Sequence, residues 1–242
     1  MNGVVPRTLD LENSALTTTQ ASRQKYLYVL QIVVALALFE GVVWSSDYAS
    51  ALWLCAAAVW ILVTTLSSTY DRSKLGLTWG ATRRLWWLPS VSLLLAVMAL
   101  AIAWYEGSLH PAFGSATRPW HYVAYSLWAL FQQFVLQSYF FVRLEFILRD
   151  SRRAVLACGL LFSLLHIPNP FLMLTTLAAG LAFCELFRRY RSLYPLALAH
   201  AVLGLCIAVT LSSDLHHGMR VGQGFLDYYA SPTVSSLRLP AR

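Results

Sequence analysis

Long apolar runs separated by short polar segments are the feature that most restricts how this chain can fold. Of its 242 residues, 58% are hydrophobic and only 12% are charged, whereas a soluble domain has roughly 25% charged residues. Each helix that crosses a bilayer core needs about 20 predominantly apolar residues. The pattern therefore predicts an all-α, polytopic membrane helical bundle of about seven transmembrane helices, at residues 26–44, 49–66, 87–104, 121–148, 154–166, 171–187 and 193–211.

Basic residues gather in alternate loops between these runs. They precede the first run and follow the second, fourth and sixth runs, as Arg7, Arg23, Lys25, Arg72, Lys74, Arg83, Arg84, Arg149, Arg152, Arg153, Arg188, Arg189 and Arg191. Because short basic loops stay on the cytoplasmic side of a membrane, we expect a cytoplasmic N-terminus and a C-terminus on the opposite side. The net charge of +7 is explained by this topology, so nucleic-acid binding is not expected.

The chain is predicted to form one membrane domain between two polar ends. Residues 1–25 form a polar N-terminal arm without the short apolar stretch of a signal peptide. Residues 26–211 form the membrane domain, and residues 212–242 form a C-terminal tail. The four cysteines stand singly in different apolar runs, without the spacing of a zinc site or a disulfide framework. No cofactor is therefore predicted.

Two acidic residues lie near the basic ends of predicted helices, where a charge requires a partner. Glu145 precedes Arg149 by four residues, and Glu185 precedes Arg188 and Arg189 by three and four. Side chains at these spacings lie on the same face of a helix. We therefore expect local ion pairs that close the helix ends.

Two histidines lie within apolar helices, where a bond to a neighbouring core group is the ordinary role of an imidazole. His166 precedes the broken sequence "HIPNP", and His200 lies in the middle of the last predicted span. The span that ends at His166 is too short to cross a bilayer. Non-helical backbone at membrane depth is tolerated only where it is enclosed by protein or lines a cavity. The sequence therefore predicts a buried polar chamber beside both histidines.

The segment "FSLLHIPNP", followed by "GLAFCELFRRYRSLYPLALAH", resembles the CPBP family of CAAX-processing and bacteriocin-processing (Abi) intramembrane proteases. In that family an EExxxR helix precedes an FxxxH motif and an HxxxN motif. Phe162 and His166 fill FxxxH, and His200 begins the last motif. The resemblance covers about residues 128–205, within a CPBP-like core at about 121–211. It implies an all-helical membrane fold whose catalytic chamber opens toward the cytoplasmic side or the bilayer and cleaves membrane-anchored peptides.

Four positions depart from the family pattern. Gln132, Gln133 and Gln137 stand where the family has two glutamates and an arginine, and Gly204 stands in place of the asparagine. An amide has nearly the shape of a carboxylate but does not accept a proton at neutral pH. Because the anions and the cation are replaced together, the predicted chamber is neutral and could form a network of amides and imidazoles. Alternatively, the glutamines only join neighbouring helices by hydrogen bonds.

Glu40 is the one carboxylate that could replace the missing base. No basic residue lies within a helical turn of it, and its depth is close to that of Gln132 and Gln133. Arg220, in the tail sequence "HHGMRVGQGFLDY", could fold over the chamber and offer a cation to Glu40 or to a substrate carboxylate. That tail also resembles the ends of some bacterial CPBP-like proteins.

Three classes of function remain open at this point. The first class is an intramembrane endopeptidase, or a divergent relative that uses Glu40 with His166 and His200. The second is a proteolytically silent pseudoenzyme that binds a membrane-anchored peptide or a membrane protein as an assembly or immunity factor. The third class is a metal-dependent membrane enzyme that adds His216 or His217 to these residues, since imidazoles and a carboxylate suit zinc or iron. The predicted surroundings are a lipid bilayer, and the predicted location is the bacterial inner membrane.

Overall fold

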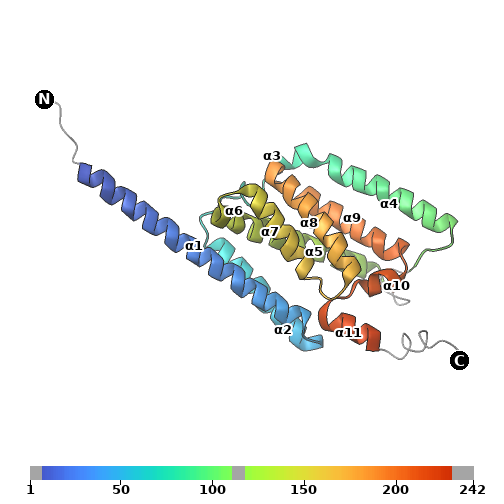
Figure 1. Ribbon diagram of the computed structural model, residues 1–242. Helices are drawn as coiled ribbons and strands as arrows, with labels where there is room; N and C mark the ends of the chain where they lie inside the picture. The colour runs from blue at the N-terminus through green and yellow to red at the C-terminus, as the bar shows by residue number, and fades with distance from the viewer. Residues whose placement is uncertain (1–6, 111–117, 231–242) are drawn as a thin grey trace.

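The computed structural model describes residues 7–110 and 118–230, and every regular element in these ranges is a helix (Figure 1). The helices in chain order are α1 (Arg7–Val43), α2 (Asp47–Leu66), α3 (Trp79–Thr82), η1 (Arg83–Leu85), α4 (Trp87–Tyr105), α5 (Pro119–Gln133), η2 (Phe134–Phe141), α6 (Val142–Leu148), α7 (Ser151–Leu164), α8 (Pro170–Tyr190), α9 (Tyr194–Thr210), α10 (Ser213–His216), η3 (His217–Met219) and α11 (Gly222–Ala230).

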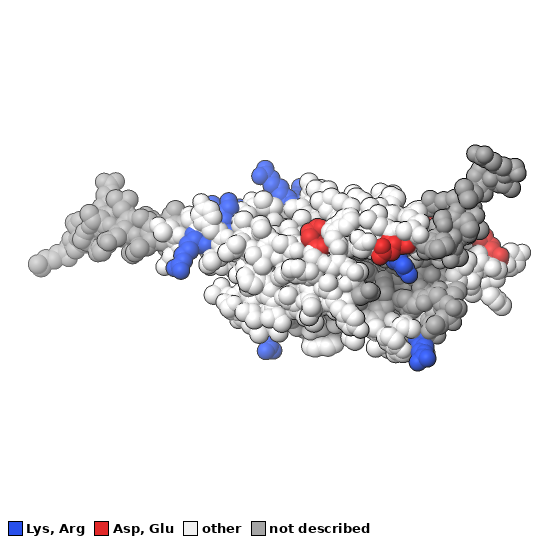
Figure 2. All heavy atoms as spheres, turned by 90° about the horizontal axis from the view of Figure 1, so that it is seen from below, with Lys and Arg blue, Asp and Glu red and all other residues white. Residues whose placement is uncertain are grey.

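The predicted all-α membrane bundle is confirmed. Four helical stretches in the described part of the chain are long and apolar enough to cross a membrane: Thr19–Val43, Tyr48–Leu66, Arg83–Tyr105 and Pro170–Tyr190. The apolar α9 is shorter, at 17 residues. Figure 2 shows that residues other than Lys, Arg, Asp and Glu form most of the face seen from below. Many exposed leucines and valines cover the outer helices, for example Leu94 on α4, as expected for a surface that contacts lipid.

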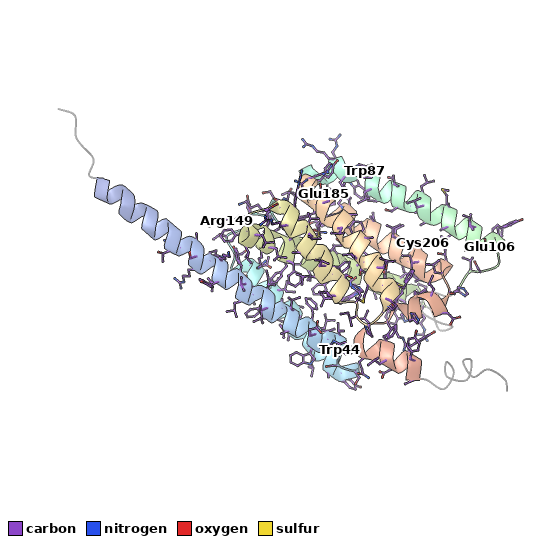
Figure 3. The ribbon with its side chains drawn as sticks, viewed as in Figure 1. Trp44, Trp87, Glu106, Arg149, Glu185 and Cys206 are labelled. Atoms are coloured by element: carbon purple, nitrogen blue, oxygen red, sulfur yellow. The ribbon has the colours of Figure 1, made fainter. Side chains whose placement is uncertain are left out.

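Helix pairs that are not always adjacent in sequence build the bundle. α1 packs on α2, α7 packs on α8, and α9 contacts both α4 and α5. The bundle has two distinct ends: Figure 3 shows Arg149 and Glu185 at one end, and Trp44 and Glu106 toward the other. We call these the basic end and the distal end, because most of the basic loops lie with Arg149. α1 begins at Arg7 and extends past the basic end (Figure 1), so the described part of the predicted polar arm is helical and continuous with the first span.

The fourth predicted span is not a uniform α-helix. It consists of α5, the eight-residue π-helical segment η2 and α6, without a break in the chain. Seven of the eight η2 residues are buried. π-Helical segments are rare and occur frequently at functional sites. Gln133 is the last residue of α5 and Gln137 lies within η2, so the glutamine series coincides with this change of helix type.

The fifth predicted span is a short helix that turns back within the bundle. α7 has 14 residues and packs against α8 as a hairpin. Asn169 caps α8, because its side-chain oxygen accepts the Leu172 N–H at 3.1 Å. Where the helices cross, a Cβ on Gly180 would lie 3.2 Å from the Cα of Gly159, so the two backbones approach closely. The hairpin carries His166 into the bundle, as the sequence predicted.

The acidic residues near the basic end are paired, but only one of them as predicted. Glu185 accepts hydrogen bonds from Arg188 and Arg189, at 2.7 and 2.6 Å, and this expectation is confirmed. Glu145 instead pairs with Arg191, at 2.6 Å. The predicted pair with Arg149 was wrong because Arg149 ends α6 in a left-handed conformation, with φ of 53°, which takes it out of the helical spacing.

Candidate functional site

A cavity of about 660 Å³ opens at the distal end of the bundle. Its walls come from α1, α2, α5, η2, α7, α8 and α9, and the C-terminal segment adds one further side. Most of the lining is apolar, including Phe39, Trp128, Phe131, Val135, Leu161 and Leu165. The polar side chains at its inner part are few, and they include Gln132, His166 and His200. A mostly apolar cavity with a few convergent polar groups is the usual form of a ligand site.

Gln133 and Gln137 lie behind this cavity and connect to it through His200. Both glutamine side chains are fully buried. Gln137 Nε2 donates to Gln133 Oε1 at 3.3 Å, and Gln133 Nε2 lies 2.9 Å from His200 Nδ1. Since an amide nitrogen only donates, His200 Nδ1 is the acceptor. In neutral His200 the proton is therefore carried by Nε2, a tautomer inferred from the hydrogen-bond network.

His166 has the opposite proton arrangement. Its Nδ1 lies 2.6 Å from the backbone carbonyl oxygen of Phe162, which only accepts, so Nδ1 carries the proton and Nε2 is the acceptor nitrogen of the neutral ring. The Phe162 ring contacts both imidazoles, with centroid distances of 4.9 Å to His166 and 6.0 Å to His200. Two cavity-lining imidazoles in contact with one phenyl ring therefore offer one donor and one acceptor.

The structure brings the glutamine series and both histidines to one cavity region, and among the described contacts only His200 bonds a glutamine. Gln132, His166 and His200 line the cavity, while Gln133 and Gln137 form the chain of amides behind it. The amides do join helices, since Gln133 on α5 binds His200 on α9. Joining helices and lining a chamber, which were alternatives at the level of sequence, coincide here.

Glu40 does not lie in this group. Its side chain is exposed, its Oε2 accepts the indole N–H of Trp44 at 2.9 Å, and it is absent from the described cavity lining. α1 turns the side chain at residue 39 toward the cavity, and the next residue faces away by about 100°. The structure therefore does not bring the proposed replacement base to the histidines.

The C-terminal segment forms the outer wall of the cavity. Arg220 lines the cavity, as the sequence suggested, together with Asp227 on α11. Asn169 fixes the segment to the α7–α8 turn by donating to the carbonyl oxygens of His216 and Arg220, at 2.9 and 3.0 Å. Gly222 N–H donates to Ile167 O at 2.8 Å. Arg220 and Asp227 are the only charged residues among the described residues that line the cavity.

The residues proposed as metal ligands do not come together in the part of the chain that the structure describes. No group of three His, Cys, Asp or Glu side chains there is arranged to hold a metal ion. His216 Nε2 lies 3.1 Å from the Leu211 carbonyl oxygen, and His217 packs against the ring of Phe225. Neither histidine of the tail joins His166 and His200.

Two polar features near the chamber were missed at the level of sequence. Tyr125, on α5, lines the cavity, and its hydroxyl oxygen lies beside Gly204. Arg143 is fully buried on the other side of η2, where it bonds to α1 and α2. The glycine gave an indirect signal for the tyrosine, since a missing side chain leaves room for a neighbour. The sequence carried no signal for the arginine's partners.

Residues 114–206 match the family model described as Rce1-like, type II CAAX prenyl endopeptidase Rce1-like. This match supports the resemblance of that segment, which we call the CPBP segment, to CAAX-protease-like membrane proteins of the CPBP family. Comparison with curated proteins and with solved structures finds no match. The CPBP segment contains Tyr125, the glutamine series and both cavity histidines, whereas α1, α2 and the C-terminal wall of the cavity lie outside it.

The position of the cavity bears on the two openings that the CPBP resemblance implies, toward the cytoplasmic side or toward the bilayer. A chamber open to the cytoplasmic side would lie at the basic end, if basic loops face the cytoplasm. The cavity instead lies among the distal ends of α1 and α2, beside Val43 and Ser46, and is bordered by α11. The orientation predicted from the basic loops therefore directs the opening away from the cytoplasm.

Proposed function

We propose that this CPBP-like protein is a non-proteolytic membrane protein that holds an uncharged segment of a membrane-anchored peptide or partner protein in its distal cavity. The hydrogen bond from Gln133 Nε2 to His200 Nδ1 carries the proposal. It occupies the acceptor nitrogen of His200, and it places an amide where a carboxylate would be needed to take a proton from water.

The polar groups of the chamber suit a peptide group better than an ion. A peptide group has one acceptor and one donor, and His200 Nε2–H and His166 Nε2 offer the complementary pair. The surrounding phenylalanine, leucine and valine side chains suit apolar side chains that flank such a group. A charged ligand group would lose its hydration in the inner chamber without gaining a counter-ion.

The opening at the distal end supports a partner on the side away from the cytoplasm. We place the protein in the bacterial inner membrane, with its basic loops in the cytoplasm and its cavity reached from the outer leaflet or the opposite aqueous side. An assembly or immunity factor that retains a membrane-bound polypeptide fits this arrangement.

A peptide with an apolar anchor and an uncharged extended segment tests the proposal in proteoliposomes. The peptide carries one photoreactive residue, so binding is measured as cross-links to the cavity residues and hydrolysis as new peptide fragments. The unmodified protein is expected to cross-link without producing fragments. Removing both imidazoles, with His166→Ala and His200→Ala, is expected to lower the cross-link yield about tenfold or more, because two hydrogen bonds are lost.

Cleavage by the unmodified protein would overturn the proposal. Asp227 and Glu40 would then be compared as bases, because Asp227 is the one carboxylate among the described cavity-lining residues and Glu40 was the candidate from the sequence. Asp227→Asn or Glu40→Gln, whichever abolished cleavage, would identify the base. Fragments produced only by Gln133→Glu would support a chamber silenced by the loss of its carboxylate.

A further inference from the structure

The hydroxyl group of Tyr125 occupies the space that a side chain at Gly204 would fill. A Cβ built on Gly204 would lie 1.9 Å from the Tyr125 hydroxyl oxygen and 2.9 Å from the ring carbon that bears it. No side chain fits at position 204 while Tyr125 keeps this place. The glycine on α9 therefore admits a polar atom that comes from α5.

The side chain that carries this hydroxyl group lines the same cavity as the polar groups of the chamber. Gly204 follows His200 by one helical turn on α9, so both lie on one face of that helix. Tyr125 precedes Gln132 by two turns on α5, about 10 Å along the axis. Tyr125, Gln132 and His200 all line the cavity. The tyrosine thus extends the row of amide and imidazole groups toward the distal opening.

We infer that Tyr125 is a ligand-binding residue of this cavity, whose hydroxyl group, seated against Gly204, hydrogen-bonds a neutral carbonyl group on the bound molecule. The inference rests on the proposed function and adds to it a residue and a ligand class. The position that bears an asparagine in the CPBP pattern is empty here, and a phenol from another helix supplies a neutral polar group in that space. A phenol hydroxyl both donates and accepts, so it serves a carbonyl oxygen without introducing charge.

The ligand class follows from the neutrality of every polar side chain in the inner chamber. Tyr125, Gln132, His166 and His200 offer donors and acceptors but no fixed charge, and the charged Arg220 and Asp227 lie on the outer C-terminal wall. An uncharged amide at the end of an apolar chain can use both the polar groups and the apolar walls. A carboxylate or an ammonium on the same chain would be left without a counter-ion.

A set of three probes with the same chain tests the inference in protein-containing phosphatidylcholine nanodiscs. Photoreactive dodecanamide labels the protein, and unlabelled dodecanamide, dodecanoate or dodecylamine competes with it. We expect labelling of cavity residues and at least tenfold better competition by the amide than by either ion. Tyr125→Phe, which removes only the hydroxyl group, should weaken amide competition about five- to tenfold. Tyr122→Phe is the matched control, because Tyr122 lies on the same helix but is exposed and outside the described cavity lining.

Two further variants separate a binding role from a purely structural one. Gly204→Ala should displace the phenol and weaken amide competition as much as Tyr125→Phe does. In Tyr125→Ala combined with Gly204→Asn, where removal of the ring leaves room for the new side chain, the new amide should restore at least part of the affinity lost in Tyr125→Ala. Selective loss for the amide, with unchanged weak competition by dodecanoate, would support the role in binding.

The outcomes distinguish this inference from the proposed function. Preference for the amide in the unmodified protein together with unchanged affinity in Tyr125→Phe would overturn the role of Tyr125 and leave the proposed function standing. No preference for the amide over the two ions would overturn both. Equal loss for all three competitors in Tyr125→Phe, with a lowered unfolding temperature, would assign the hydroxyl group to helix packing and overturn the inference.

Discussion

Two buried polar clusters include residues of the π-helical segment η2, one toward the distal end and one toward the basic end, and only one of them contains a charge. On the distal side, Gln133, Gln137 and His200 form a neutral chain next to a cavity. Toward the basic end, the guanidinium group of Arg143 is fully buried. No carboxylate in the described part of the chain lies within ion-pair distance of it; its counterparts are neutral oxygens and aromatic rings.

The Arg143 cluster shows how this bundle accommodates a permanent cation. Arg143 Nε donates to Gln31 Oε1 at 2.8 Å, and its Nη atoms donate to the carbonyl oxygens of Tyr139 and Thr64, at 3.2 and 3.1 Å. Thr64 lies in the last turn of α2, where unpaired carbonyl groups attract a cation. The Tyr139 ring lies 3.7 Å from the guanidinium carbon, a distance favourable for a cation–π contact.

The difference between the clusters shows that this bundle accommodates a buried charge where fixed protein groups surround it. Arg143 joins α1, α2 and η2 in a site that is closed to solvent. The free-energy cost of removing its charge from water is therefore offset by partners that belong to the protein itself. The chamber adjoins a cavity, and a charge there would need a new counter-ion with each ligand. A neutral chamber and a charged, closed cluster are therefore consistent within one bundle.

Arg143→Ala is expected to have the largest effect on stability among the variants that test this contrast. It removes the donor that three acceptors share, two of them in buried bonds, and opens a cavity, so we expect a loss of about 3–5 kcal/mol in the free energy of unfolding. The measurement is chemical unfolding in detergent, followed by tryptophan fluorescence. Arg153→Ala is the matched control, because the Arg153 side chain is 76% exposed, and it should change stability little. A loss of the same size in both variants would remove the special role of the buried cation.

Gln133→Leu is expected to have the second largest effect. It keeps the bulk of the side chain but removes the bonds to Gln137 and His200, at a cost of about 1–3 kcal/mol. The same unfolding measurement applies. Gln132→Leu provides the comparison, since Gln132 lines the cavity and is only partly buried, so its loss should be smaller. If Gln132→Leu cost more, the chain of buried amides would not be the structural core of the chamber.

A change of pH should loosen the C-terminal wall of the cavity without disturbing the Arg143 cluster. Burial lowers the pKa of His216, and the nearby His217 and His110 act in the same direction, against the opposing bond to Leu211. The folded wall therefore binds fewer protons than the unfolded one, and its stability is complete above the ordinary histidine pKa of about 6.5 and falls below it.

Amide hydrogen exchange checks this prediction. After correction for intrinsic exchange, residues 213–230 should exchange several-fold faster at pH 5.5 than at pH 7.5. His216→Gln, which cannot titrate, should remove most of the difference. An equal response in the variant and the unmodified protein would assign the pH dependence to other groups.

Gln31→Glu is expected to have the smallest effect. It gives Arg143 a carboxylate at the position of the amide oxygen that it already contacts at 2.8 Å. Because the gain from a buried ion pair is offset by the desolvation of the new anion, the free energy of unfolding should change by less than about 1 kcal/mol. Gln20→Glu, on the exposed part of the same helix, is the control. A stabilisation of several kcal/mol would mean that the neutral oxygens leave the cation poorly compensated.

The sequence predicted the helical class and most of the chamber because both leave local signals. Apolar runs mark membrane helices, and the ordered series from Gln132 to His200 marks residues that meet in one place. The α7–α8 turn was predicted from a run too short to cross a bilayer and from two prolines.

The remaining features depend on how helices pack. Glu145 pairs with Arg191 rather than Arg149 because α6 ends in a left-handed residue that no spacing rule foresees. Tyr125 lies seven or more residues from every residue of the glutamine series, and only the packing of α5 on α9 brings its hydroxyl group to Gly204. Glu40 was predicted to lie at the same depth in the membrane as the chamber, but its side chain projects from the face of α1 that points away from the cavity, so it is not placed to act as the base.

The π-helical segment separates the two clusters by a fixed rotation as well as by a length of chain. Each residue of an α-helix is rotated by about 100° about the helix axis relative to the residue before it. A π-helical segment changes this angle, so the side chains that follow it face another direction than in a continuous α-helix. Deleting a single residue from η2 would let the helix revert to regular winding, and α6 would then rotate relative to α5. Gln133 could keep its place at His200, but Arg143 would swing out from between α1 and α2, so the two clusters would no longer form together.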